Sequence, residues 1–128
     1  KIAPRKARIL IFGVAFKGSP KTSDMRGSPS LQIVDALRKS GVKNISAFDT
    51  AVPTEYIKRA GISPARALQS AVRAADVILC MNNNPDFSAI NIKKYSRGRK
   101  KPLYIFDGWS VWAEKELHIL PSVVYRNL

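Results

Sequence analysis

The sequence lacks several features by which enzymes and membrane proteins are usually recognised. Its 128 residues contain one cysteine, Cys80, and one histidine, His118. A single cysteine excludes a disulfide within the chain and is typical of a reducing compartment, so we expect a cytoplasmic protein. No apolar run approaches the roughly 20 residues that cross a bilayer, and no secretory signal is visible. We therefore expect no membrane partner.

Residues in patterns that perform chemistry are equally scarce. His118 lies beside apolar residues and Cys80 lies within a predicted buried strand, so we interpret both as structural. No spacing of His, Cys, Asp and Glu resembles a metal site, and no nucleophile is paired with a base. The sequence predicts a binding domain with no metal and no catalytic residue of its own.

Negative charge is also in short supply. The chain has 22 Lys and Arg against 9 Asp and Glu, a net charge of +13, which attracts nucleotides, nucleic acids or acidic surfaces. The run Lys93–Lys101 holds only Tyr95 among its cations, whereas nucleic-acid grooves interleave several aromatic residues. We interpret this run as a solvated loop. A stand-alone basic α/β module that binds nucleic acid or another polyanion remains the alternative function, and a purely structural domain is a third.

Short apolar runs alternate with helical patterns along the chain. Strands are expected at residues 8–14, 44–49, 76–81, 103–107 and 122–126, and helices at 29–39, 55–60, 64–75, 87–92 and 113–117. Most of the strands are continuously apolar, which indicates a sheet buried on both faces. We predict one α/β domain over residues 1–128, with residues 1–7 as a linker remnant. Its Rossmann-like, doubly wound and mostly parallel sheet has about five strands in the order 2-1-3-4-5, with helices on both faces.

Polar residues collect where these strands end. The carboxyl ends lead into Gly13–Lys17, Asp49–Thr50, Asn82–Asp86 and Asp107–Trp109. Doubly wound sheets bind ligands outside the carboxyl ends of their strands, where the strand order reverses. We therefore expect a ligand site on this edge of the sheet.

The stretch Ile9–Ser30 has the layout of a phosphate-binding unit: a strand, a polar loop and a helix start. Ser28 is the expected N-cap of the helix, followed by a proline at its first position. The loop contains no GxGxxG, and Gly13 and Gly18 are not followed by the Lys-Ser/Thr of a P-loop. It offers the cations Lys17 and Arg26, either to an anion or simply to water.

Several motifs in this stretch and beyond it resemble one family. Gly13–Lys17, Thr22–Arg26 and Ser28–Pro29 resemble the FK…T-x-D-x-R-x-S-P motif of the C-terminal, UDP-binding domain of the UDP-glucose/GDP-mannose dehydrogenase family. Further similarities follow in the same order along the chain, at Phe48–Val52, Ala74–Val77, Asn84–Phe87 and Ile105–Gly108.

The resemblance implies a part of an enzyme that oxidises the C6 hydroxyl of a UDP-hexose or UDP-N-acetylhexosamine to a carboxylate with NAD. Family members carry an N-terminal NAD-binding domain and a central region that dimerises and holds the catalytic cysteine. Neither is present in this chain, so we expect it to be inactive alone and Cys80 not to be the nucleophile. The expected partners are a UDP-sugar, the missing domains and, in a homodimer or larger assembly, further copies.

The resemblance also assigns roles to individual residues. Phe16 and Lys17 would meet the UDP-sugar, and Arg26 would reach NAD held mainly by the missing N-terminal domain. Three residues would support the loop: Gly13, Asp24 and Ser28.

Two positions differ from the family pattern. The segment Gly18–Lys21 is longer than the family's usual spacing, and Trp109 stands where the family often has an arginine that contacts the nucleotide. An indole cannot pair with a phosphate, but it stacks on a base or a sugar. Trp109 is therefore a third expected substrate contact, and its presence favours an N-acetylhexosamine over glucose.

Overall fold

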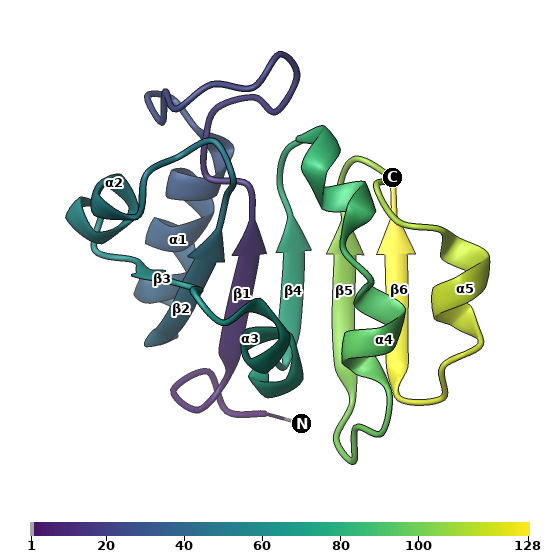
Figure 1. The fold of residues 1–128 in the computed structure, drawn as a ribbon. Helices are drawn as coiled ribbons and strands as arrows, with labels where there is room; N and C mark the ends of the chain where they lie inside the picture. Colours follow the sequence, from purple (N-terminus) through teal and green to yellow (C-terminus); the bar gives the residue numbers. More distant parts are fainter. Residues whose placement is uncertain (1) are drawn as a thin grey trace.

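The computed structural model describes residues 2–128, which form one sheet of parallel strands flanked by helices (Figure 1). The strand order is β3-β2-β1-β4-β5-β6, and every neighbouring pair is parallel. The strands are β1 (Arg8–Phe12), β2 (Asn44–Phe48), β3 (Ser63–Pro64), β4 (Val77–Cys80), β5 (Leu103–Asp107) and β6 (Val123–Asn127). The predicted doubly wound topology is confirmed, with one strand more than expected.

Helices lie on both faces of the sheet. They are α1 (Pro29–Lys39), α2 (Thr54–Arg59), α3 (Leu68–Ala74), the 3₁₀ helix η1 (Pro85–Ala89), α4 (Ile92–Ser96) and α5 (Glu114–His118). In Figure 1, α3 and α4 lie in front of the sheet and α1 lies behind it. Ser28 is the N-cap of α1, as predicted, and its side chain accepts from the Ser30 N–H. The left-handed Gly41 (φ +94°) follows the helix, because only glycine adopts that conformation without cost.

The sheet separates two hydrophobic cores. The core on the α3 and α4 side is centred on Phe12, which meets Phe48, Phe87 and Trp112 edge-to-face at centroid distances of 5.6, 5.5 and 5.1 Å. Leu117 of α5 belongs to this core. The other core packs β1 and β2 against α1 and α2. Because both faces bury apolar side chains, the central strands are continuously apolar, as their sequences indicate.

The structure corrects the expected start of one helix. Ser63 and Pro64 were predicted to begin a helix, but they form β3 beside Ser46 and Ala47, and α3 begins only at Leu68. Ser-Pro also suits the end strand of a sheet, because the missing proline N–H can face away from the neighbouring strand.

The basic run was also wrongly predicted as a loop throughout. Its first part belongs to helix α4, and Arg99 is half-buried rather than solvated. The Arg99 guanidinium donates to the carbonyl oxygens of Val72 (2.9 Å), Arg73 (2.6 Å) and Ala75 (2.6 Å) at the end of α3. This arginine therefore closes the C-terminus of a helix.

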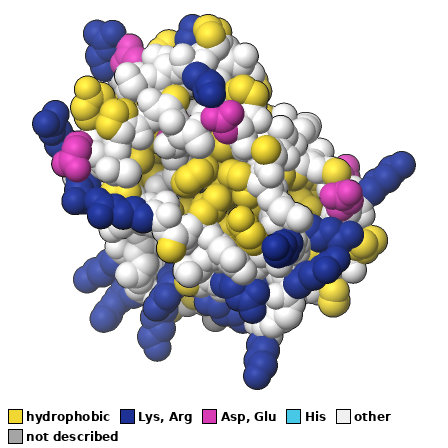
Figure 2. All heavy atoms as spheres, viewed as in Figure 1, with side chains coloured by type: hydrophobic (Ala, Val, Ile, Leu, Met, Phe, Trp, Pro, Cys, Tyr) yellow, Lys and Arg dark blue, Asp and Glu magenta, His cyan; other side chains and the backbone are white. Residues whose placement is uncertain are grey.

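The remaining positive charge is unevenly placed. Figure 2 shows Lys and Arg side chains gathered along the lower edge of the molecule, where the strands begin, and hydrophobic side chains in the middle of the face. Helix C-termini lie at this edge in a doubly wound fold, and their dipoles favour cations. The helix C-termini account for part of the basic edge.

Candidate functional site

The loop after β1 lies directly against the segment that follows β4. Gly13 has φ +93°, and a Cβ there would lie 2.5 Å from the Asn82 side chain. A Cβ on Gly18 would lie 2.0 Å from the backbone nitrogen of Asn84. The Gly18 N–H donates to Asn83 Oδ1 at 3.2 Å. Both glycines are thus required by close approach of the backbone, and they hold the loop over the point where the strand order reverses.

Asp49, at the end of β2, fixes the beginning of this loop. Its Oδ2 accepts from the N–H groups of Val14 (2.9 Å) and Ala15 (3.2 Å), and its Oδ1 accepts from Ala51 N–H (2.9 Å). In dinucleotide-binding sheets an acidic residue near this position binds a ribose hydroxyl. Here both oxygens are already occupied by backbone groups, so Asp49 serves the loop rather than a ribose.

A polar network joins the ends of β2 and β4 to the loop. Asn84 Nδ2 donates to Thr50 Oγ1 (2.8 Å), which donates to Asp86 Oδ2 (2.6 Å), and Lys21 Nζ lies 3.0 Å from the same oxygen. The Thr50 hydroxyl and the Lys21 ammonium lower the pKa of Asp86. Sequence reasoning placed these residues on the correct edge but assigned them no role, because their contacts join segments far apart in the chain.

Phe16 and Lys17 project from this framework. The Phe16 N–H donates to the Asp24 carbonyl at 2.9 Å, which closes the base of the loop 16–24. Phe16 is 41% exposed, and Lys17 Nζ lies 5.4 Å from the centre of its ring. Within residues 2–128, Lys17 makes no ion pair, whereas Lys21 and Arg26 do. The loop therefore presents an aromatic face and an available cation.

Asp24 and Arg26 form a bidentate ion pair further along the same loop. Arg26 Nε and Nη2 donate to Asp24 Oδ1 (2.9 Å) and Oδ2 (2.7 Å), and the Arg26 backbone N–H donates to Oδ1 (3.0 Å). These contacts lower the pKa of Asp24 to about 2. Beside the pair lies an open hollow of about 480 Å³, lined also by Tyr56 and Arg59 of α2. The hollow exposes two guanidinium groups that an anion could meet.

The N-terminus of α1 is buried under the loop. Ser28 and Ser30 are 1% and 0% exposed, and the Ser30 hydroxyl donates to the Gly13 carbonyl. The N–H groups of Ser30 and Leu31 are taken by the side chain and the carbonyl of Ser28. The expected layout of strand, loop and helix is present, but the loop cations face solvent rather than these first-turn N–H groups.

Trp109 is displayed by a second rigid turn, after β5. The buried carboxylate of Asp107 accepts from the N–H groups of Trp109 (3.2 Å) and Trp112 (2.9 Å) and from the Tyr125 hydroxyl (2.7 Å). Burial and the neighbouring carboxylate raise the pKa of Tyr125. Trp109 is 54% exposed. Trp109 follows β5, and Lys17 follows β1. Because β4 lies between these two strands, the two residues are on the same edge of the sheet but two strands apart.

The two remaining candidates for a reactive side chain, Cys80 and His118, have structural surroundings. Cys80 is buried, and burial together with Asp107 raises the pKa of its thiol, which keeps it protonated and unreactive. His118 pairs with Glu114 at 3.1 Å. Over residues 2–128, no cluster of three His, Cys, Asp or Glu side chains suits a metal ion. In the same part of the chain, no helix is both long and apolar enough to span a bilayer.

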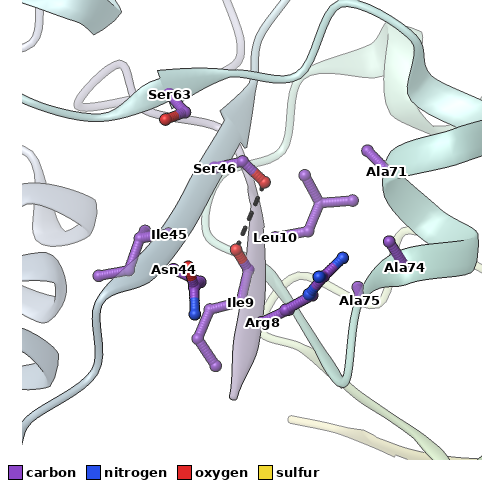
Figure 3. Close-up of a pocket in the computed structure, with 10 residues that line it drawn as sticks. All are labelled: Arg8, Ile9, Leu10, Asn44, Ile45, Ser46, Ser63, Ala71, Ala74 and Ala75. Carbon is purple, nitrogen blue, oxygen red and sulfur yellow. Dashed lines mark hydrogen bonds between the residues drawn. The ribbon is translucent and has the colours of Figure 1, made fainter. Parts of the chain in front are cut away.

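A second hollow, of about 240 Å³, lies away from the carboxyl ends of the strands. It is lined by Arg8, Asn44, Ser46 and small residues of α3, and the Ser46 hydroxyl points at the Ile9 carbonyl (Figure 3). None of the predicted site residues reaches it. The candidate site is therefore the edge formed by the loops after β1, β2, β4 and β5, which we call the rim.

Comparisons with known proteins agree with the motifs on the rim. The chain is 30% identical over 113 residues to UDP-N-acetyl-D-mannosamine dehydrogenase of Pyrococcus horikoshii, covering 88% of the chain and 24% of that protein. It is 28% identical over 102 residues to UDP-glucose 6-dehydrogenase of Rhizobium meliloti, covering 79% and 23%. The chain thus spans about a quarter of the length of these relatives.

Solved structures have the same fold. The P. horikoshii UDP-D-ManNAc dehydrogenase matches with a TM-score of 0.74 at 27% identity, covering 98% of this chain and 26% of that one. An NDP-N-acetyl-D-galactosaminuronic acid dehydrogenase of Methanosarcina mazei also gives 0.74, at 24% identity, with 98% and 25% covered. The family model described as "UDP-glucose/GDP-mannose dehydrogenase family, UDP binding domain" matches residues 10–114. This chain belongs to that family and comprises its UDP binding domain.

Proposed function

We propose that the rim binds the UDP part of a nucleotide sugar, within a longer NAD-dependent dehydrogenase that oxidises the sugar to a uronic acid. The observation that carries the proposal is the exposed pair Phe16 and Lys17, on a loop whose base is closed by the Phe16–Asp24 backbone hydrogen bond and which is tied to Asn83 through the Gly18 N–H. A fixed cation beside an aromatic face suits a diphosphate linked to a base or a sugar. The full-length enzyme would act in the cytoplasm as a homodimer or larger assembly.

Arg26 is proposed to face the cofactor. Its side chain is 91% exposed and its orientation is set by Asp24. Because this chain has no dinucleotide fingerprint, NAD would be held mainly by another domain, and Arg26 would approach it across the gap between domains. The chain alone would therefore bind a UDP-sugar weakly and catalyse nothing.

The sugar is proposed to be an N-acetylhexosamine. Trp109 offers an exposed indole, which can stack on a base or a sugar but cannot pair with a phosphate. Of the two curated relatives, the one at 30% identity is named for UDP-N-acetyl-D-mannosamine and the one at 28% for UDP-glucose. The exposed indole is therefore the observation that favours an N-acetylhexosamine over glucose.

Calorimetric titration of UDP tests the binding site. Lys17→Ala removes one charge-assisted contact to phosphate and is expected to weaken UDP binding about 10- to 100-fold. Lys94→Ala removes an equal charge from the exposed side of α4, away from the rim, and is expected to leave UDP binding unchanged. Equal effects of the two substitutions, or no UDP binding by the full-length protein, would contradict the proposal.

A further inference from the structure

One half of the sheet is left bare on the α1 side. The register aligns two rows of side chains across that face: Ile9, Val77, Tyr104 and Val124 in one row, and Ile11, Leu79, Phe106 and Arg126 in the other. In each row the residue on β1 is buried and the residues on β5 and β6 are exposed. Ile9 and Ile11 are 6% and 0% exposed, whereas Tyr104, Phe106 and Val124 are 47%, 38% and 38% exposed.

The cause is the position of the helices. The side chains of β1 on this face pack under α1, and those of β4 are partly covered at its margin. Helix α5 packs its Leu117 into the core on the opposite side, with Val123 and Tyr125. In Figure 1 no helix lies behind β5 and β6. Within residues 2–128, no helix covers the outer face of these two strands.

Such a surface is unusual for parallel strands. They occur almost only where both faces of the sheet are covered, because their side chains are apolar on both sides. A contiguous apolar patch of aromatic and aliphatic side chains commonly marks a contact with other protein. Phe106 and Tyr104 would bury large areas in such a contact and would dominate its energy.

We propose that this bare face, made by Tyr104, Phe106, Val124 and Arg126, packs in the longer protein against an apolar helix from outside these 128 residues. The inference rests on the proposed function only in treating the chain as one domain of a longer dehydrogenase. The available length supports it, because the chain spans about a quarter of its curated relatives. A helix there would cover the side chains of β5 and β6 in the way that α1 covers those of β1 on the same face.

Charge favours this occupant over a second copy of the chain. Arg126 makes no ion pair within residues 2–128; its guanidinium donates to the Tyr125 carbonyl. Two copies stacked through this face would bring Arg126 side chains and two net charges of +13 together. A helix with an acidic residue facing Arg126 would instead pair that charge, and it is the chemistry we assign to the occupant.

Thiol labelling, read by mass spectrometry on the peptide that carries each introduced cysteine, tests the proposal; Cys80, the only cysteine among these 128 residues, is buried. Val124→Cys places one reactive thiol on the bare face, and Tyr104→Cys is a second variant should the first fold poorly. Ser70→Cys, on the exposed side of α3, is the matched control. Maleimide labelling is compared between the 128-residue chain and the product of the complete reading frame.

In the 128-residue chain, all three thiols are expected to react at the rates of exposed groups. In the longer protein, labelling at position 124 or 104 is expected to slow by at least about 100-fold, because it then requires local opening, while position 70 stays reactive. Equal labelling in both proteins would overturn the proposal. So would a reading frame of 128 residues alone, or protection in the short chain that grows with its concentration. The measurement uses no UDP, so it fails or succeeds independently of the binding site.

Discussion

At the scale of single residues, the rim depends on two glycines that lie against another segment. Gly18→Ala would place a methyl group 2.0 Å from the Asn84 nitrogen, so the loop must move away. We expect a loss of about 1–3 kcal/mol in the free energy of unfolding, measured in urea. The amide resonances of Asn83 and Asn84 are expected to shift, because Gly18 donates a hydrogen bond to Asn83.

Gly27→Ala is the matched control for this prediction. Gly27 has φ +69°, and a Cβ there would meet nothing within 4 Å. Its substitution is expected to cost about 1–2 kcal/mol through backbone strain alone. The resonances of Asn83 and Asn84 should stay where they are. If Gly18→Ala also left them unmoved, the close approach at Gly18 would be disproved.

A second residue-scale prediction concerns acid titration of the loop. The pKa of Asp24 is about 2, below its ordinary value of 3.8, because Arg26 bonds to the carboxylate. A lowered folded-state pKa stabilises the fold above pH 3.8, and this contribution is lost as the pH falls toward 2. Carboxyl NMR titration should give a midpoint near 2, and in Arg26→Ala the midpoint should return toward 3.8. A midpoint that Arg26→Ala does not change would refute the assignment.

Sequence reasoning located the projecting side chains better than the residues that hold them. Lys17 and Arg26 are identifiable as cations on a loop between a strand and a helix. The contacts of Asn84, Thr50 and Asp86 join segments more than thirty residues apart, so no local pattern reveals them. The one sequence signal was their position, directly after strands that end on the same edge.

At the scale of elements, Arg99 joins the end of α3 to the segment that leads into β5. Its guanidinium donates to carbonyls at the end of α3 and to the Pro102 carbonyl (3.3 Å) before β5. Arg99→Ala leaves these carbonyls without their charged donor. We expect unfolding free energy to fall by about 1.5–3 kcal/mol in urea titration.

Lys100→Ala is the neighbouring control, because Lys100 is exposed and makes no ion pair in residues 2–128. It should change stability by less than about 0.5 kcal/mol. Similar losses for the two variants would mean that the basic run acts through its total charge. The same comparison tests the nucleic-acid alternative. Arg99 bonds to backbone carbonyls and Lys101 pairs with Asp76, so these two cations stabilise the fold and are less available to a nucleic acid.

The elements that could be predicted are those that their own sequence specifies. The central strands are apolar runs that end in glycine or a polar residue, and α1 carries a serine cap with a proline after it. β3 has two residues and exists only because β2 lies beside it. Its Ser-Pro sequence equally suits a helix start, so the choice is made by the neighbouring strand and not by the segment.

At the scale of the whole molecule, one face of the sheet is covered along its length, whereas the other face is covered only in part. The α3 side has a continuous core from β1 to β6, whereas the α1 side ends at β4. The sequence pattern alone could not show this difference. The Leu-Tyr-Ile-Phe-Asp sequence of β5 is apolar at four of its five positions and so indicates burial on both faces, whereas the structure buries only alternate residues of the strand.

The net charge of +13 leads to a prediction for the whole chain. Three Lys or Arg side chains form ion pairs within residues 2–128, so repulsion among the many other cations outweighs attraction. Salt screens both the repulsion and the attraction, so the stronger of the two decides whether added salt raises or lowers the unfolding temperature. We expect the unfolding temperature to rise as sodium chloride is increased from about 0.01 to 0.15 M, a range over which the Debye length falls from about 30 to 8 Å.

The double variant Lys94→Glu, Lys100→Glu lowers the net charge and should show a smaller rise in differential scanning calorimetry. A fall in unfolding temperature with salt would mean that the few ion pairs, Lys101 with Asp76 above all, outweigh the repulsion of the whole surface.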